Sequence, residues 1–323
     1  MYEKSNNLKD AESIYLDLLS SNRSPDVLYN IGNFYYKIKN IKKAEKFLSE
    51  ALEEYQKLVG VYKETYSPEL ASTLNNLANL YKSKNELQKA EKFYEEALDI
   101  CKSLAENDPK NYCRRLTGIL NNLALLQKDK NDFAKAEKSL LKVLDMIRKI
   151  DSKENSINMG LTLHNLGHLY YSTNAFEKAE KYYSKALDVR RLIAKDNQST
   201  NLSDLAGTLN NLASLKRVTN EFEKAKEYHL EAVEIYEQLV KDNPSYYLPT
   251  LSISLNSLGN HYLQTDKLEE AENIYRRSLD IVRKLDKENP NFYLSSLADT
   301  LNGLASVQLK KNEFEKAEKN YEE

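Results

Sequence analysis

The chain has 323 residues, of which 30% are charged, and its formal net charge is -2. This balance gives no global attraction to nucleic acid, and no stretch approaches eighteen uncharged apolar residues, so we expect neither nucleic-acid binding nor membrane insertion. With only 8 glycines and 6 prolines the chain has few natural linkers, which favours long helices throughout.

The chain opens with a clipped copy of a sequence that then returns along its whole length. Each copy is marked by the alanine of a motif similar to KAEK. These anchor alanines are Ala11, Ala44, Ala90, Ala136, Ala179, Ala225, Ala271 and Ala317. Most neighbouring anchors are 46 residues apart, as from Ala44 to Ala90. A fixed period of this length predicts an array of similar structural units.

The copies divide the chain, 1-323, into the segments of one array. We assign partial repeats to residues 1-22 and 295-323, and complete repeats to residues 25-60, 68-107, 113-151, 158-196, 203-242 and 249-288. Around each anchor, apolar residues recur at helical spacing, as at Leu74 and Leu77. Each complete repeat is therefore predicted to hold two helices, helix A before the anchor and helix B through it.

Prolines and short polar turns predict where these helices begin and end. Proline disfavours helix in the residue before it, so we expect helix B to end just before Pro109, Pro244 and Pro290. The pairs Ser24-Pro25 and Ser67-Pro68 suit a capping residue followed by proline in the first turn of helix A. The turns before helix B carry residues that tolerate a left-handed conformation, namely Asn85, Asn131, Asn174, Asn220, Asp266 and Asn312.

One junction differs from the others. From Ala136 to Ala179 the interval is three residues shorter than usual, and residues 151–160 lack the proline and tyrosine found at Pro109 and Tyr112. We therefore expect the chain to follow a different path there and the pitch of the array to change.

The order of small and aromatic residues resembles the tetratricopeptide repeat, a helix-turn-helix unit. In the copy that starts TLNNLA, the positions that carry the resemblance are Leu74, Leu77, Ala78, Tyr81, Ala90, Tyr94 and Ala97. The LNNLA opening and the KAEKFYEEALDI close are most similar to the long repeats of kinesin light chains and of large bacterial tetratricopeptide proteins. The resemblance implies an all-α fold, a right-handed α-solenoid of helix-turn-helix repeats with an elongated helix B.

Two departures from the family pattern affect the expected packing. Tyr81 is replaced by Gln127, Lys216 and Gln308 in other copies, which predicts looser packing there. The period exceeds the usual one of about 34 residues by about twelve. Because apolar residues such as Leu98 continue the helical spacing after the anchor, we assign the extra residues to helix B.

The resemblance places helix A on the concave face of the array, where it carries polar side chains at adjacent positions in most copies. An asparagine side chain offers two donors and an acceptor, so a ladder of them would grip the main chain of an extended peptide. The candidate peptide-binding residues are Asn30, Asn33, Asn75, Asn76, Asn79, Lys82, Asn121, Asn122, Lys128, His164, Asn165, His168, Tyr171, Asn210, Asn211, Arg217, Asn256, Asn260 and Asn302. The alternative is structural, with each asparagine bonded to the next helix.

The sequence thus predicts a non-enzymatic protein- or peptide-binding scaffold. Basic residues expected on the groove outnumber acidic ones, with Lys37, Lys82, Lys128, Arg217 and Lys310 against Asp26, Asp129 and Asp299, which favours an acidic peptide. One alternative is a sensor or oligomerisation arm of a larger signalling enzyme whose catalytic domain lies outside this chain, and another is a structural spacer. The terminal repeats lack polar capping helices, so we expect a piece of a longer protein or end-to-end self-association.

No residues suited to catalysis or cofactor binding form a recognisable site. His164 and His168 lie four apart on one helix face, but no third ligand is spaced for a metal. Cys101 and Cys113 are too few for a disulfide framework and are expected to be reduced packing residues. The residues after Met1 lack the apolar core of a secretory signal, which favours a cytoplasmic location.

Overall fold

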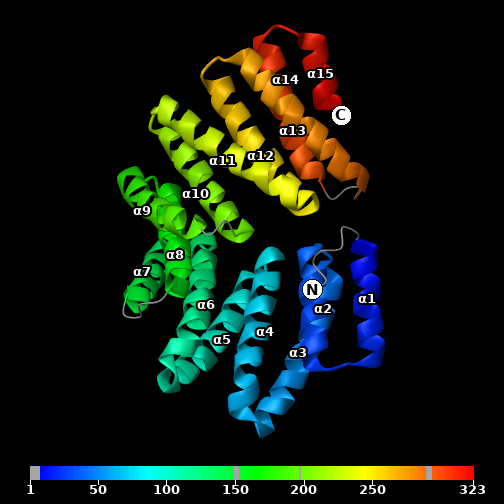
Figure 1. The fold of residues 1–323 in the computed structure, drawn as a ribbon, viewed down its shortest axis with the longest axis vertical. Helices are drawn as coiled ribbons and strands as arrows, with labels where there is room; N and C mark the ends of the chain where they lie inside the picture. The colour runs from blue at the N-terminus through cyan, green and yellow to red at the C-terminus, as the bar shows by residue number, and fades with distance from the viewer. Residues whose placement is uncertain (1–7, 149–152, 196–197, 289–292) are drawn as a thin grey trace. The chain divides into compact units, whose positions relative to one another are not determined.

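The computed structural model describes residues 8–148, 153–195, 198–288 and 293–323, which form fifteen α-helices (Figure 1). They are α1 (Leu8–Ser21), α2 (Pro25–Lys37), α3 (Ile41–Val61), α4 (Lys63–Ser83), α5 (Leu87–Asn107), α6 (Pro109–Asp129), α7 (Phe133–Arg148), α8 (Lys153–Ser172), α9 (Phe176–Ala194), α10 (Ser199–Val218), α11 (Phe222–Asp242), α12 (Pro244–Gln264), α13 (Leu268–Glu288), α14 (Leu294–Lys310) and α15 (Phe314–Glu322). None of the helices in these ranges is long and apolar enough to cross a membrane.

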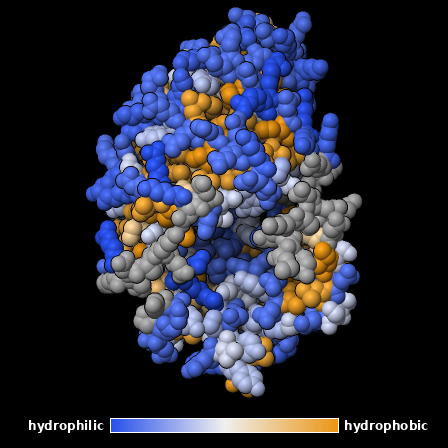
Figure 2. All heavy atoms as spheres, in the orientation of Figure 1, coloured by the Kyte–Doolittle hydropathy of each residue, from blue (hydrophilic) through white to orange (hydrophobic). Residues whose placement is uncertain are grey.

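The helices form two compact units, Met1–Asn165 and Leu166–Glu323. Within them consecutive helices pack on one another, as α4 does on α5 and α12 on α13. We call the even-numbered helices the first helices, because each begins a repeat, and α3 to α15 with odd numbers the second helices. The predicted all-α array of helix hairpins is confirmed. On the face seen in Figure 2, hydrophilic residues predominate and apolar residues show in separate patches among them.

The turns inside the hairpins have the backbone conformation that the sequence predicts. Two residues before each second helix from α5 to α15, φ is positive, between 53° and 64°, at Asn85, Asn131, Asn174, Asn220, Asp266 and Asn312. Asparagine and aspartate enter this left-handed region more readily than other residues with a side chain. A single residue therefore reverses the chain within each hairpin.

The core is built where the two helices of a hairpin cross. The anchor alanines from Ala44 to Ala271 are completely buried. A β-carbon added to Gly167 would lie 2.5 Å from the buried ring of Tyr183, so only a residue without a side chain fits between α8 and α9 at that point. The predicted packing role of Cys101 and Cys113 is confirmed, since both are free and buried. Burial raises the pKa of the Cys101 thiol to about 11.

The prolines mark most, but not all, of the predicted boundaries. α5 and α11 end just before Pro109 and Pro244, which begin α6 and α12. The predicted helix start at Pro68 is wrong, because α4 begins at Lys63 and Pro68 lies inside it. The second helices are elongated as predicted, but the first are elongated too, and α4 and α5 have 21 residues each. Pro290 lies outside the described residues.

The predicted change of path between Ala136 and Ala179 depends on residues 149–152, which also lie outside the described residues. It therefore stays a prediction.

The polar residues that replace Tyr81 are buried and bonded, which corrects the expectation of looser packing. Gln127 accepts a hydrogen bond from the Ser139 hydroxyl at 3.0 Å. Gln308 accepts one from the Asn320 amide at 2.7 Å. Tyr81 itself stacks on Phe93, which holds the position equivalent to Ser139 and Asn320. The second helix thus supplies a partner that matches the replacement, aromatic for tyrosine and polar for glutamine.

Lys216, the third replacement, is 3% exposed and forms ion pairs with Glu180 and Glu221. Two carboxylates therefore compensate the buried ammonium group. The packing at this position is not looser than at Tyr81 either.

Candidate functional site

The amides predicted to form a binding ladder lie between neighbouring first helices in the N-terminal unit. The Asn76 amide nitrogen donates to the Tyr29 hydroxyl at 3.0 Å and to the Asn33 side-chain oxygen at 2.8 Å. The Asn122 amide nitrogen donates to the Asn75 side-chain oxygen at 3.0 Å. These bonds join α2 to α4 and α4 to α6.

The deepest part of the ladder is a buried network between α6 and α8. Asn121 is 1% exposed, and its amide nitrogen donates to the Thr162 hydroxyl at 3.0 Å and to the Thr117 carbonyl at 2.9 Å. Its side-chain oxygen accepts from Asn165 at 3.0 Å. Donors and acceptors that are already satisfied in a dry interface are not available to a ligand. Asn121 and Asn165 therefore fit the structural alternative, in which each asparagine bonds to the next helix.

The same arrangement recurs in the C-terminal unit. Asn210 donates to the Ser254 hydroxyl at 2.9 Å, and Asn256 donates to the Thr300 hydroxyl at 2.8 Å. These hydroxyls belong to a set that sequence reasoning missed. They lie seventeen residues before the anchor alanine and are completely buried: Thr73, Thr162, Thr208, Ser254 and Thr300. The threonine that begins TLNNLA, Thr73, occupies this position, so the sequence motif already contained the hydroxyl.

A second class of amides lies eleven residues before the anchor and includes Asn79, which is half-buried, and Asn260, which is exposed. The Tyr94 hydroxyl donates to the Asn79 side-chain oxygen at 2.5 Å, and the Tyr275 hydroxyl donates to that of Asn260 at 2.7 Å. Among the described residues, no hydrogen bond uses the amide nitrogen of Asn79 or of Asn260. A tyrosine of the second helix thus orients each asparagine through its oxygen, and at the exposed Asn260 the two N–H donors remain open.

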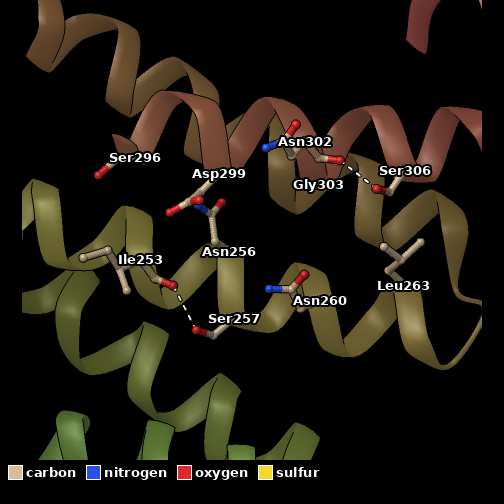
Figure 3. Close-up of a pocket in the computed structure, with 10 residues that line it drawn as sticks. All are labelled: Ile253, Asn256, Ser257, Asn260, Leu263, Ser296, Asp299, Asn302, Gly303 and Ser306. Atoms are coloured by element: carbon tan, nitrogen blue, oxygen red, sulfur yellow. Dashed lines mark hydrogen bonds between the residues drawn. The ribbon is translucent and has the colours of Figure 1, made fainter. Parts of the chain in front are cut away.

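In the C-terminal unit, Asn260 belongs to a groove of about 420 Å³ between α12 and α14 (Figure 3). The groove is lined by Ile253, Asn256, Ser257, Asn260, Leu263, Ser296, Asp299, Asn302, Gly303 and Ser306. Asn260 and Asn302 are exposed. The side-chain amide of Asn302 forms no hydrogen bond with the described residues. The groove therefore offers open amide groups from both of its helices.

The floor of this groove depends on Gly303. A β-carbon there would lie 2.3 Å from the ring of Tyr275, which is 1% exposed. Other copies carry asparagine at this position, as at Asn76 and Asn122. Because α14 has glycine instead, it approaches the tyrosine closely. A tyrosine hydroxyl is protonated at neutral pH, and burial raises the pKa of Tyr275 further, to about 12. The hydroxyl therefore keeps donating to Asn260.

The basic candidates are engaged by the protein itself. Lys82 pairs with Asp129 at 3.1 Å, and Lys128 lies 3.5 Å from the same carboxylate. Arg217 donates to the Gln264 side-chain oxygen at 2.7 Å. Of the ten residues that line the α12–α14 groove, only Asp299 is charged. The prediction of an acidic partner finds no support at this groove.

The remaining candidates lie apart from the groove. Tyr171 packs near the Phe176 ring, with 6.0 Å between centroids. Asn30 is exposed on α2, whereas His164, His168 and Asn211 are half-buried on first helices. Within the described ranges, no three histidine, cysteine or acidic residues are grouped to hold a metal ion.

Comparison with known proteins identifies the repeat. The family model described as Tetratricopeptide repeat matches residues 23–103, 116–191, 204–284 and 250–323. A search of curated protein sequences finds no match.

Solved structures share the fold at low sequence identity. The chain is similar to BtubC (BKLC) from P. vanneervenii, with 24% identity and a TM-score of 0.63 over 73% of this chain and 88% of the other. It is similar to a signal transduction ATPase with numerous domains and a tetratricopeptide repeat sensor from Pyrococcus horikoshii, with 22% identity and a TM-score of 0.62 over 99% and 45%. A Rap protein complexed with competence and sporulation factor matches with 18% identity and a TM-score of 0.61 over 97% and 77%.

Proposed function

Because the chain belongs to the tetratricopeptide repeat family, we propose that it is a non-enzymatic scaffold that binds an extended peptide segment of a partner protein between α12 and α14. The observation that carries the proposal is the groove of about 420 Å³, of which seven of the ten lining residues bear an amide, hydroxyl or carboxylate group. A peptide main chain carries a donor and an acceptor at every residue other than proline, and such a lining can pair with both.

Asn260 and Asn302 are the residues proposed to hold the main chain. They come from neighbouring helices, so a peptide lying in the groove would meet both. The hydrogen bond from Tyr275 already orients Asn260, at 2.7 Å. A side chain that is ordered before binding loses less conformational entropy when the ligand arrives, which improves affinity. The similar fold of the Rap protein complexed with competence and sporulation factor supports a ligand-binding role for such an array.

Replacing both Asn260 and Asn302 by alanine is expected to weaken peptide binding by about tenfold, because each lost hydrogen bond contributes roughly 0.5–1.5 kcal/mol. The peptide is selected from a random display library with the wild-type chain, and its affinity is measured by fluorescence anisotropy. Both side chains are exposed, so the melting temperature should fall mainly through Asn260, whose loss leaves the buried Tyr275 hydroxyl without its acceptor.

The matched control is Asn273→Ala, an exposed asparagine on the second helix α13. It should bind the selected peptide as the wild type does. Unchanged affinity in the double variant, or an equal loss in the control, would rule out these two amides as the grip.

A second candidate function is that of a sensor arm in a larger signalling enzyme. It is favoured by the likeness to the ATPase with a tetratricopeptide repeat sensor, which covers 99% of this chain and 45% of that one. Binding of the same peptide would then change the association state of the chain. Light scattering with and without the peptide separates the two candidates, because a simple scaffold keeps the same association state when the peptide binds.

A further inference from the structure

Asp299 is an isolated negative charge in the α12–α14 groove. It is exposed, and no described residue forms an ion pair with it. By contrast, Asp129 pairs with Lys82 and Asp266 with Lys310. A carboxylate left alone in a hollow lined otherwise by neutral groups attracts a cation more than one already compensated by a lysine.

The helices of the groove supply no cation to this end of it. The sequence of α12 contains neither lysine nor arginine, and α14 contains only Lys310. Lys310 lies eleven residues beyond Asp299, about 16 Å along the helix. It bonds to the Asp266 carboxylate at 2.5 Å and to the Leu263 carbonyl at 3.2 Å. Lys310 does not line the groove and is already bonded, so neither helix supplies a cation to Asp299.

Opposite Asp299 lies an exposed apolar side chain. Ile253 on α12 and Asp299 on α14 are both eighteen residues before their anchor alanines, so they hold the same place in neighbouring repeats. Both line the groove, and Ile253 is 57% exposed (Figure 3). An apolar surface beside a carboxylate matches the side chain of lysine or arginine, which has an aliphatic stem and a charged head.

No other pair of neighbouring repeats has this combination. The position holds Asp26, Ser72, Gly118, Leu161 and Gly207 in the preceding copies. Asp26 has no apolar neighbour in the next repeat, where Ser72 stands, and it accepts a hydrogen bond from the Tyr55 hydroxyl. The pairing of an exposed isoleucine with an uncompensated aspartate is thus particular to α12 and α14.

We infer that the α12–α14 groove selects peptides that carry a lysine or arginine, whose stem lies on Ile253 and whose charged head pairs with Asp299. The inference rests on the proposed function, which it deepens by naming the partner's chemistry. The polar residues of α14 continue from Asp299 at helical spacing through Asn302 to Ser306. The main chain that follows the basic residue would therefore run toward Asn302 and Asn260. One carboxylate suffices for a monovalent side-chain cation, whereas a divalent metal ion would need more ligands.

The test uses a random peptide display library and three versions of the chain. The wild type should enrich peptides with lysine or arginine at one position. Asp299→Lys should instead enrich aspartate or glutamate at that position. The control Asp280→Lys, which changes an exposed aspartate on α13, should keep the preference of the wild type. Circular dichroism melting checks that each variant folds. Asp299 and Asp280 are both exposed, so we expect the fold to tolerate lysine at either position.

The affinity of one selected peptide then measures how strongly Asp299 and Ile253 contribute to binding. Asp299→Asn should weaken binding of the basic peptide by about fivefold at low salt, with less loss at high salt, as for a partly exposed ion pair. Ile253→Ser should weaken it as well, while leaving the preference for a basic residue.

The outcomes separate this inference from the proposed function. If the wild type selects peptides without a basic residue, or Asp299→Lys selects the same peptides as the wild type, the inference is overturned and the proposed function stands. If the wild type selects no peptide at all, both are overturned.

Discussion

Replacing Asn121 by alanine is expected to lower the free energy of unfolding of the N-terminal unit by about 2 kcal/mol. The side chain is 1% exposed and joins α6 to α8 through Thr162 and Asn165. Its loss leaves the Asn165 amide, itself 5% exposed, without this acceptor. A buried polar group that loses its partner costs roughly 1–3 kcal/mol. Urea unfolding followed by circular dichroism measures the change.

The control for this prediction is Asn30→Ala, at an exposed asparagine on α2. Both replacements gain the higher helix propensity of alanine, worth roughly 0.5 kcal/mol, so the difference between them isolates the buried network. Asn30→Ala should be neutral or slightly stabilising. Equal stability of the two variants would contradict the structural role assigned to the Asn121 network.

Mild acid is expected to destabilise the C-terminal unit through His229. This residue is 1% exposed, its Nδ1 hydrogen donates to the Asn210 side-chain oxygen at 3.2 Å, and its Nε2 has no hydrogen-bond partner. Burial, together with the nearby His261 and Arg217, lowers the pKa of His229 to about 3. The folded chain therefore keeps this imidazole neutral at every pH above that value.

The unfolded chain takes up a proton at His229 below its ordinary pKa of about 6.5, whereas the folded chain does not. Stability therefore falls as the pH drops below about 6.5 and continues to fall toward the folded pKa. At pH 5 the loss amounts to about 2 kcal/mol relative to pH 7, from 1.5 pH units at about 1.4 kcal/mol each. Urea unfolding at the two pH values measures it.

His229→Leu is the variant that isolates this effect. The same repeat position is filled by Leu48 and Leu140, both buried, so leucine fits there. The variant should lose most of the stability difference between pH 7 and pH 5. Burial also lowers the pKa of His261, which accounts for a remaining part. An unchanged pH dependence in His229→Leu would show that acid acts elsewhere.

Features set by local sequence were predictable. The left-handed turns at Asn85 and its equivalents follow from the properties of asparagine, and the hairpins follow from the spacing of apolar residues around each anchor. The start of α4 was not predictable in this way. A Ser-Pro pair fits the first turn of a helix, but Pro68 is the sixth residue of α4, beyond the first turn, where its missing N–H removes one backbone hydrogen bond.

The roles of the amides could not be separated from sequence. Asn121 and Asn302 hold the same place in their repeats, yet one is buried and bonded whereas the other is exposed and open. The difference depends on a partner more than forty residues away, such as Thr162 for Asn121. Recognising that the hydroxyl seventeen residues before an anchor bonds to the asparagine of the preceding repeat would have shown which asparagines have a hydroxyl partner. How deeply each amide is buried depends on how the neighbouring helices pack.

The proposed function places an extended peptide between α12 and α14. Photo-crosslinking tests this placement most directly, with a library-selected peptide that carries a benzophenone side chain and mass spectrometry of the adducts. Adducts are expected on residues 253–264 and 296–306, which include the described lining of the groove. Adducts confined to the second helices α11, α13 and α15, from a peptide that binds with full affinity, would contradict it.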